Sequence, residues 1–302
     1  STFEYAGQTD YDSLRYIRLN NTPNHIALHK KLAALEGAEA ALVTSSGMSA
    51  ITTALLTYLQ SGDHLLAQST LYGGTADYVK HDLPQYGIEV DFFDAMIPDD
   101  WESKVKSNTK VVYVETITNP LMSVPELGAI IELGKKHKLI SMIDNTFASP
   151  ALYCPIMQGF DISLHSATKY LNGHTDIVAG VVIGSENNIS KVRSKLNHLG
   201  GSLDPNACFL LHRGIKTLSL RMNRQCQNAM AIARFLESHP KVKQVNYPGL
   251  ESNPSHNRAK EYLCGFSAMI SFELTGDVSA ADAFIGRLEY PICTASLGGV
   301  ES

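Results

Sequence analysis

The sequence has no excess of basic residues and no long apolar run. Lys and Arg number 25 against 30 Asp and Glu, which gives a net charge of −5 with His neutral and leaves no basic surplus for a nucleic-acid backbone. Apolar stretches such as residues 177–183 are far shorter than the roughly 20 residues that a membrane span needs. We therefore expect no nucleic-acid partner and no membrane partner, but small molecules and further copies of the chain.

Paired cysteines and metal-binding motifs are also missing. The five cysteines are scattered and never spaced as CxxC, which argues against a disulfide framework or a Cys-rich zinc site. His25 and His29 lie one helical turn apart, but the glutamate of a catalytic HExxH motif is absent between them. No GxGxxG follows the first expected strand, so the fingerprint of dinucleotide binding is absent too. With no export signal at the start, we expect reduced thiols, a cytoplasmic location and no metal.

What is present is typical of an α/β fold. The apolar fraction of 44% and the charged fraction of 18% suit a chain with a buried core. Short β-branched apolar runs alternate with helical patterns at 48–60, 75–86 and 125–137, which predicts a doubly wound, mostly parallel sheet. Ligands of such sheets bind beyond the carboxyl ends of the strands. We expect strands at 40–43, 65–67, 90–93, 111–114, 140–143, 162–164 and 178–183.

The pattern changes after about residue 201. Residues 221–238 have helical apolar spacing, and strands are expected at 242–245 and 268–272, separated by Pro- and Asn-rich turns. The chain ends on a Ser-Leu-Gly-Gly-Val-Glu-Ser stretch with loop character, so we expect the last domain to be incomplete. The expected parts are an N-terminal arm at 1–20, a large domain at 21–213 and a smaller α+β domain at 214–302.

Two loops of small residues follow expected strands. Residues 45–49 open a helix, where small side chains let backbone N–H groups converge on an anion at the positive end of the helix dipole. A plain helix cap with a tight turn explains the same residues equally well. Tyr72 lies on the glycine-hinged loop 71–75, where it could stack on a planar ligand or simply occupy a surface turn.

Two charged residues follow later strands. Asp144 ends an apolar run, so its carboxylate could pair with a cationic ring nitrogen or cap the next helix. Lys169 lies among small and hydroxyl residues, where desolvation could lower the pKa of its amine enough for a Schiff base; a solvated surface lysine is the alternative. With the two loops, these residues match pyridoxal 5′-phosphate, which needs an amine, a carboxylate, an anion cup and a flat group on its ring.

The sequence resembles the trans-sulfuration, or Cys/Met-metabolism, pyridoxal-phosphate enzymes along nearly its whole length. That family includes cystathionine γ-lyase, γ-synthase and β-lyase, O-acylhomoserine sulfhydrylases and methionine γ-lyase. The resemblance implies a type I pyridoxal-phosphate transferase fold, in which the large domain binds the cofactor. The matching signatures are Ser46-Gly47-Met48-Ser49-Ala50, Tyr72-Gly73-Gly74-Thr75, Glu115 with Asn119-Pro120, Asp144-Asn145-Thr146-Phe147, Ser166-Ala167-Thr168-Lys169-Tyr170, Asn172-Gly173-His174, Arg213-Gly214-Ile215-Lys216-Thr217-Leu218, Tyr247-Pro248-Gly249-Leu250 and Ser296-Leu297-Gly298-Gly299.

The resemblance implies a role for each candidate residue. Lys169 would be the Schiff-base lysine and proton carrier, Asp144 the partner of the pyridine nitrogen, and Tyr72 both the stacking residue and the acid for the departing group. Asn119 would lie near the 3′-oxygen of the cofactor, and Ser296 would contact the substrate. Four residues would hold the cofactor phosphate: Gly47, Met48, Ser166 and Thr168.

The resemblance also implies an oligomer. Tyr16 and Arg18 of the arm would reach the phosphate in a neighbouring subunit, where an arginine can bind phosphate with two donors. The active unit is then at least a dimer, and we expect a homotetramer built as a dimer of dimers.

The implied reaction is β- or γ-elimination or replacement on an amino acid such as cystathionine or an acylated homoserine. We expect a cystathionine γ-lyase-type C–S lyase; a γ-synthase, an O-acylhomoserine sulfhydrylase, a β-lyase, or a cofactor-binding protein without turnover are the alternatives. Gly74 stands where methionine γ-lyases carry a cysteine, and Ala295 where many γ-enzymes carry a glutamate. Leu297 differs from the residues of enterobacterial β-lyases. The family's arginine for the substrate carboxylate is expected beyond Ser302, so no residue here is assigned to that role.

Overall fold

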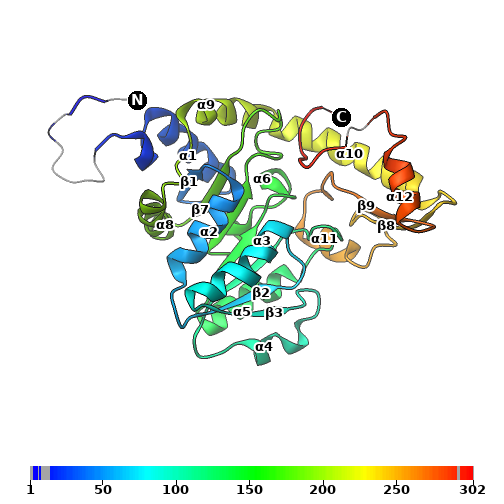
Figure 1. Ribbon diagram of the computed structural model, residues 1–302, viewed down its shortest axis with the longest axis horizontal. Helices are drawn as coiled ribbons and strands as arrows, with labels where there is room; N and C mark the ends of the chain where they lie inside the picture. The colour runs from blue at the N-terminus through cyan, green and yellow to red at the C-terminus, as the bar shows by residue number, and fades with distance from the viewer. Residues whose placement is uncertain (1–2, 6, 8–13, 291–292, 302) are drawn as a thin grey trace.

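A seven-stranded sheet in the order β1-β7-β6-β5-β4-β2-β3 forms the centre of the molecule (Figure 1). The computed structural model describes residues 3–5, 7, 14–290 and 293–301. Four neighbouring strand pairs are parallel, whereas β7 is antiparallel to both β1 and β6, so the predicted mostly parallel α/β sheet is confirmed. The strands are β1 (Ala40–Thr44), β2 (His64–Gln68), β3 (Glu89–Phe93), β4 (Thr109–Glu115), β5 (Ile140–Asp144), β6 (Ile162–Ser166) and β7 (Gly180–Gly184).

Helices cover both faces of this sheet. Successive side chains of a strand point to opposite faces, so on β4 Val111 belongs to one apolar core and Val112 to the other. Helices α2 (Gly47–Tyr58) and α8 (Glu186–Leu199) bury Leu55 and Val192 in the first core. The second core lies under α1 (Pro23–Leu35), α5 (Leu127–His137) and α9 (Pro205–Gly214). Burial on both faces explains why these strands read as continuous apolar runs.

Several shorter helices connect these elements. They are η1 (Ile17–Leu19), α3 (Gly73–Asp77), η2 (Tyr78–Asp82), η3 (Leu83–Tyr86), η4 (Pro98–Asp100), α4 (Trp101–Lys104), α6 (Ser149–Leu152), α7 (Pro155–Gln158) and η5 (Ile215–Thr217). The single helix predicted at 75–86 is therefore replaced by three pieces. Pro84 has no backbone N–H to continue an α-helix, and Gly87 ends the segment with a left-handed φ of 73°.

The C-terminal part has the expected α+β composition. The helix α10 (Leu218–Glu237) leads to a two-stranded antiparallel sheet of β8 (Val242–Asn246) and β9 (Ser271–Leu274), with α11 (His256–Tyr262) and α12 (Val278–Ile285). In Figure 1, β8, β9 and α12 lie on the side of the molecule away from β1. The strand β9 begins three residues later than predicted, because Ser267 has a positive φ of 69° and its hydroxyl donates to Phe147 O.

The two histidines spaced one turn apart have structural partners. His25 contacts Thr22 Oγ1 at 2.7 Å and Leu203 O at 2.8 Å. The Val43 N–H donates to Nε2 of His29 at 3.1 Å, so that nitrogen carries no proton there. Within the described part of the chain, no helix has both the length and the apolar composition for a bilayer span.

Candidate active site

A cavity of about 480 Å³ opens where the parallel strands end. The loops after β1, β2, β4, β5 and β6 supply most of its wall, as the fold predicts for a ligand site. Nine of the eleven candidate residues line it: Gly47, Met48, Tyr72, Asn119, Asp144, Ser166, Thr168, Lys169 and Ser296. Residues up to 249 positions apart in the sequence thus share one cavity, as counted from Gly47 to Ser296.

The start of α2 forms one end of this cavity. The Ser46 hydroxyl caps the helix by accepting the Ser49 N–H at 3.0 Å, and the N–H groups of Gly47 and Met48 have no protein acceptor among the described residues. A Cβ on Gly47 would lie 2.8 Å from the Ser166 Cβ, so only glycine lets the helix start approach the end of β6 so closely. Unpaired N–H groups at a helix start fit an anion such as a phosphate.

The two hydroxyls predicted to bind a phosphate, those of Ser166 and Thr168, differ in their hydrogen bonds within the protein. Thr168 Oγ1 donates to Ala179 O at 3.2 Å and accepts the Ala179 N–H at 3.1 Å. Ser166 holds the strand end through its backbone N–H, which donates to Thr146 Oγ1 at 2.8 Å, and its own hydroxyl has no partner among the described residues. Ser166 is therefore the hydroxyl that can donate to an anion without losing another hydrogen bond.

Asp144 places a carboxylate in the middle of the cavity wall. It ends β5, and its Oδ1 accepts the Thr146 N–H at 2.9 Å. Desolvation by the surrounding protein raises the pKa of Asp144, and the hydrogen bonds from Thr146 oppose this rise. In the described residues no Lys or Arg forms an ion pair with it, so a cationic ring nitrogen would supply the missing positive charge.

Lys169 lies in the turn that follows β6. Its Nζ donates to Ser296 Oγ at 3.1 Å, and among the described side chains it has no carboxylate partner. Desolvation lowers the pKa of the Lys169 amine. A larger neutral fraction makes the amine a better nucleophile and base than a surface lysine.

Tyr72 and Asn119 lie on two other loops at the mouth. Tyr72 is 49% exposed, and its ring rests against Gly74, where a Cβ would come within 2.8 Å of the Tyr72 Cε1. Asn119 lines the cavity, and its backbone N–H donates to Glu115 Oε2 at 3.3 Å. A flat ligand entering beside Tyr72 would therefore meet an aromatic ring and an amide side chain.

Glu115 also lines the cavity; it belongs to a matching signature of the sequence, but no role is predicted for it there. It ends β4 as Asp144 ends the neighbouring β5, and the two residues are register partners in the sheet. Burial, and secondly the charge of Asp144, raise the pKa of Glu115 to about 8, while backbone N–H groups of Tyr72 and Asn119 oppose the rise. The position of Glu115 in the sequence could have indicated this site, because a carboxylate that ends a buried strand reaches the same edge of the sheet as Asp144.

Tyr16 and Arg18 do not line this cavity. Arg18 Nη1 donates to Asn197 O at 2.9 Å, and its guanidinium lies 5.5 Å from the centre of the Tyr16 ring, which belongs to a side chain that is 51% exposed. Part of the predicted arm at 1–20 lies outside the described residues.

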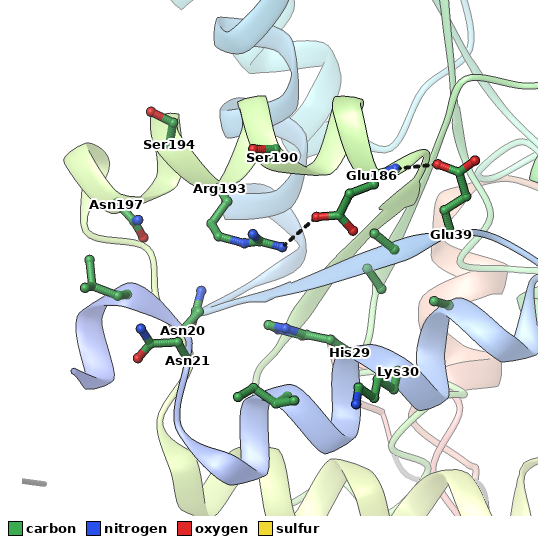
Figure 2. A pocket seen from close by; sticks show the side chains of 15 residues that line it. Asn20, Asn21, His29, Lys30, Glu39, Glu186, Ser190, Arg193, Ser194 and Asn197 are labelled. Atoms are coloured by element: carbon green, nitrogen blue, oxygen red, sulfur yellow. Dashed lines mark hydrogen bonds and ion pairs between the residues drawn. The ribbon is translucent and has the colours of Figure 1, made fainter. Parts of the chain in front are cut away.

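A second cavity, of about 540 Å³, lies between α1, β1 and α8 (Figure 2). Figure 2 shows Arg193 and Glu186 of α8 facing each other, with 3.9 Å between Arg193 Nη2 and Glu186 Oε1. Glu39 accepts the backbone N–H of Glu186 at 2.8 Å. His29 also lines the cavity, and burial lowers its pKa to about 3. The charges of these residues are thus neutralised or satisfied by the protein itself.

Comparisons with known proteins agree with the site. The family model described as Cys/Met metabolism PLP-dependent enzyme matches residues 1–302. An L-methionine gamma-lyase of Porphyromonas gingivalis is 40% identical over 301 residues, which cover 99% of this chain and 75% of the relative. A cystathionine gamma-lyase of Bacillus subtilis is 40% identical over 303 residues, which cover 100% of this chain and 79% of the relative.

A solved structure agrees as well. The cystathionine gamma synthase of Xanthomonas oryzae, in complex with aminoacrylate and cysteine, superposes with a TM-score of 0.95 at 37% identity, covering 100% of this chain and 78% of that one. The chain therefore belongs to the Cys/Met metabolism family of pyridoxal-phosphate-dependent enzymes. The predicted family, fold class, cofactor and enzyme class are confirmed.

Proposed function

We propose that this member of the Cys/Met metabolism family is a C–S lyase of the cystathionine γ-lyase type. The observation that carries the proposal is a single cavity that joins a desolvated lysine amine, a carboxylate with no cationic partner in the ranges that the structure describes, and an open helix start. Relatives named for γ-lyase and γ-synthase reactions support a sulfur amino acid as the substrate class.

The residues of the cavity are proposed to hold the cofactor at four points. The N–H groups of Gly47 and Met48, with the Ser166 hydroxyl, would bind the phosphate. Asp144 would pair with the ring nitrogen, and Tyr72 would cover the ring. Asn119 would lie near the 3′-oxygen of the cofactor, and Thr168 near its phosphate. When bound, pyridoxal phosphate supplies a ring that accepts the electron pair left on a substrate carbon after its proton is removed.

Lys169 and Tyr72 are proposed to move the protons. The lowered pKa of Lys169 favours the neutral amine, the form that can remove the α-proton of an amino acid and carry it to a neighbouring carbon. The Ser296 hydroxyl, 3.1 Å away, would hold this amine beside the substrate. The Tyr72 hydroxyl would donate a proton to the departing thiol.

The proposal favours cystathionine over methionine. Methionine γ-lyases at 39–42% identity and a cystathionine γ-lyase at 40% are similarly related to the chain, so overall similarity does not separate the two substrates. Gly74 supports the choice, because it leaves no side chain against the Tyr72 ring, where methionine γ-lyases place a thiol. Leu297 adds an apolar wall, whereas Ala295 offers no carboxylate to the distal amine of cystathionine and so argues against the choice.

Product analysis tests the proposed reaction. The chain is loaded with pyridoxal phosphate and offered cystathionine, methionine, or O-acylhomoserine with cysteine. We expect cysteine and 2-oxobutyrate from cystathionine. Pyruvate with homocysteine would instead indicate a β-lyase, new cystathionine a γ-synthase, and methanethiol a methionine γ-lyase. A chain that forms no yellow complex with the cofactor would contradict the whole proposal.

We further propose a cytoplasmic dimer of dimers in which Tyr16 and Arg18 serve a neighbouring subunit. Their position outside their own cavity supports this arrangement. A mixing experiment tests it: Lys169→Ala and Arg18→Ala chains are unfolded together and reassembled. A hybrid dimer then contains one site with both natural residues, so about a quarter of the activity should return. No recovery in confirmed hybrids would mean that Arg18 acts within its own chain or not at all.

A further inference from the structure

Glu115 is a buried carboxyl group at the cavity, and the described residues place no cationic partner beside it. It is 4% exposed and ends the central strand β4, directly beside Asp144 of β5. Among the described residues it forms no ion pair, yet a second acidic group lies next to it. A buried carboxyl group beside a second one is costly for folding, so its presence calls for a function that a side chain without two acceptor oxygens cannot fulfil.

Both oxygens of this carboxylate accept backbone N–H groups from the mouth of the cavity. Oε1 accepts the Tyr72 N–H at 2.6 Å, and Oε2 accepts the Asn119 N–H at 3.3 Å. Tyr72 lies 43 positions earlier in the chain and Asn119 four positions later. One side chain therefore ties the loop after β2 to the loop after β4.

A second contact strengthens the same junction. The side chain of Gln68, the last residue of β2, accepts the Glu115 N–H at 3.2 Å and donates to Thr70 O. The ends of β2 and β4 are thus joined on both sides of Glu115. The loop that carries Tyr72 leaves the sheet from this junction, so its first residues are held by Gln68 and its aromatic residue by Glu115.

A carboxylate is the one side chain of this length that can hold both loops. It has two oxygens with lone pairs, and acceptor capacity remains when the carboxyl group carries a proton, so both oxygens can accept an N–H. Glutamine has one oxygen and one NH₂ group, and the NH₂ group would face one of the two N–H donors. Glutamine can therefore hold one loop but not the other.

We propose that Glu115 is a positioning residue that fixes Tyr72 and Asn119 on either side of the place taken by the cofactor ring. It touches their backbones, so it acts through the position of these two residues and not on the reacting atoms. The inference rests on the proposed function, because Tyr72 and Asn119 are the residues proposed to face the ring.

The first test measures the loops without the cofactor. Hydrogen–deuterium exchange is compared for the unaltered chain, Glu115→Gln and Glu115→Ala, with Glu132→Gln on the exposed face of α5 as a matched control. In Glu115→Gln we expect about tenfold faster exchange in at least one of the segments 69–78 and 116–121, and in Glu115→Ala in both. Glu132→Gln should exchange like the unaltered chain. Unchanged exchange in both Glu115 variants would overturn the inference.

The second test measures the cofactor site. Pyridoxal phosphate is titrated into the same proteins, and binding is followed by the visible absorbance of the bound cofactor and by its circular dichroism. We expect about tenfold weaker binding and an altered dichroic band for Glu115→Gln, since stacking on Tyr72 would change. Faster exchange with unchanged affinity and dichroism would reduce Glu115 to a structural role and overturn the inference. If the unaltered chain binds no cofactor, the proposed function fails, whereas a failure confined to the variants concerns Glu115 alone.

Discussion

Two cavities of the molecule are similar in volume, about 480 and 540 Å³, but differ in the partners of their charged groups. In the cavity between α1 and α8, Arg193 faces Glu186, and Glu39 accepts a backbone N–H (Figure 2). In the cavity at the strand ends, the Lys169 amine donates to the Ser296 hydroxyl and has no ion-pair partner in the described part of the chain, and Asp144 lies beside another carboxyl group. Volume therefore does not distinguish the active site from the other cavity, whereas buried carboxyl groups and a desolvated amine without an ion-pair partner among the described residues do.

The backbone differs between the two cavities in the same way. The cavity at the strand ends begins at an open helix start, where Gly47 admits a close approach that a Cβ would prevent. The N–H group of Val43, beside the other cavity, is already bonded to His29. The N–H groups at the start of α2 thus remain available to a ligand, whereas the Val43 N–H beside the other cavity is used within the fold.

The largest effect is expected from removing the Lys169 amine, which is one of the groups that distinguish the two cavities. Lys169→Ala should lower turnover by more than about a thousandfold, because nucleophile and base are lost together, and it should abolish the yellow complex. Lys30→Ala, which removes an amine from the other cavity, is the matched control and should leave both unchanged. Product release and the visible spectrum are the measurements. Equal losses in both variants would contradict the distinction between the cavities.

The second prediction concerns the carboxylate pair and stability in the cofactor-free state. The pKa of Glu115 is raised to about 8, above its ordinary value in the unfolded chain, so its contribution to stability is present at low pH and is lost as pH rises toward about 8. Between pH 5 and pH 7 the folded state keeps a proton that the unfolded state has released. The unaltered chain should therefore lose about 2–3 kcal/mol relative to Glu115→Gln over this interval.

Urea unfolding at several pH values measures this difference. Glu186→Gln, in the other cavity, should follow the unaltered chain at every pH. A constant difference between the unaltered chain and Glu115→Gln from pH 5 to pH 7 would show that Glu115 is already ionised at pH 5. That result would mean that the protein stabilises the charge of Glu115, as it does the charges of Arg193 and Glu186 in the other cavity.

The strands and the position of the site could be predicted from the sequence, whereas the role of Glu115 could not. The strands were predictable because buried parallel strands are continuous β-branched runs, and the site followed because their carboxyl ends share one edge. Asp144 and Lys169 could be named from that rule. Glu115 obeys the same rule, but its role depends on accepting N–H groups from Tyr72 and Asn119, a contact between loops that no local pattern encodes.

Other features depend on packing that the sequence pattern does not contain. The antiparallel insertion of β7 between β1 and β6 cannot be read from apolar runs, which look alike in either direction. The helix predicted at 75–86 changes to other helical forms because Pro84 interrupts it locally. The direction of Arg18 depends on Asn197, a residue 179 positions away.

A smaller effect is expected from closing the space at the helix start. A Cβ on Gly47 would lie 2.8 Å from Ser166 Cβ and 3.0 Å from its Cα, so Gly47→Ala must push the helix start away from β6. We expect about tenfold weaker cofactor binding, the loss of roughly one good hydrogen bond to a charged group. Gly73→Ala is the matched control, since a Cβ there meets no atom within 4 Å. Equal affinities for the two variants in a spectroscopic titration would remove the helix start from the site.

The smallest effect is expected at Gly74, and it tests the space within the cavity that binds the substrate. A Cβ there would come within 2.8 Å of Tyr72 Cε1 and 3.4 Å of Met48 Sδ, so Gly74→Ala must turn or shift the exposed Tyr72 ring. Because that ring can move toward solvent, we expect only a severalfold loss of kcat/KM, about 1 kcal/mol, with little change in the melting temperature. The loss should be larger for cystathionine than for methionine, since the longer substrate extends farther past the ring. Equal losses for both would show that Tyr72 serves the cofactor alone and that the space beside Gly74 does not select the substrate.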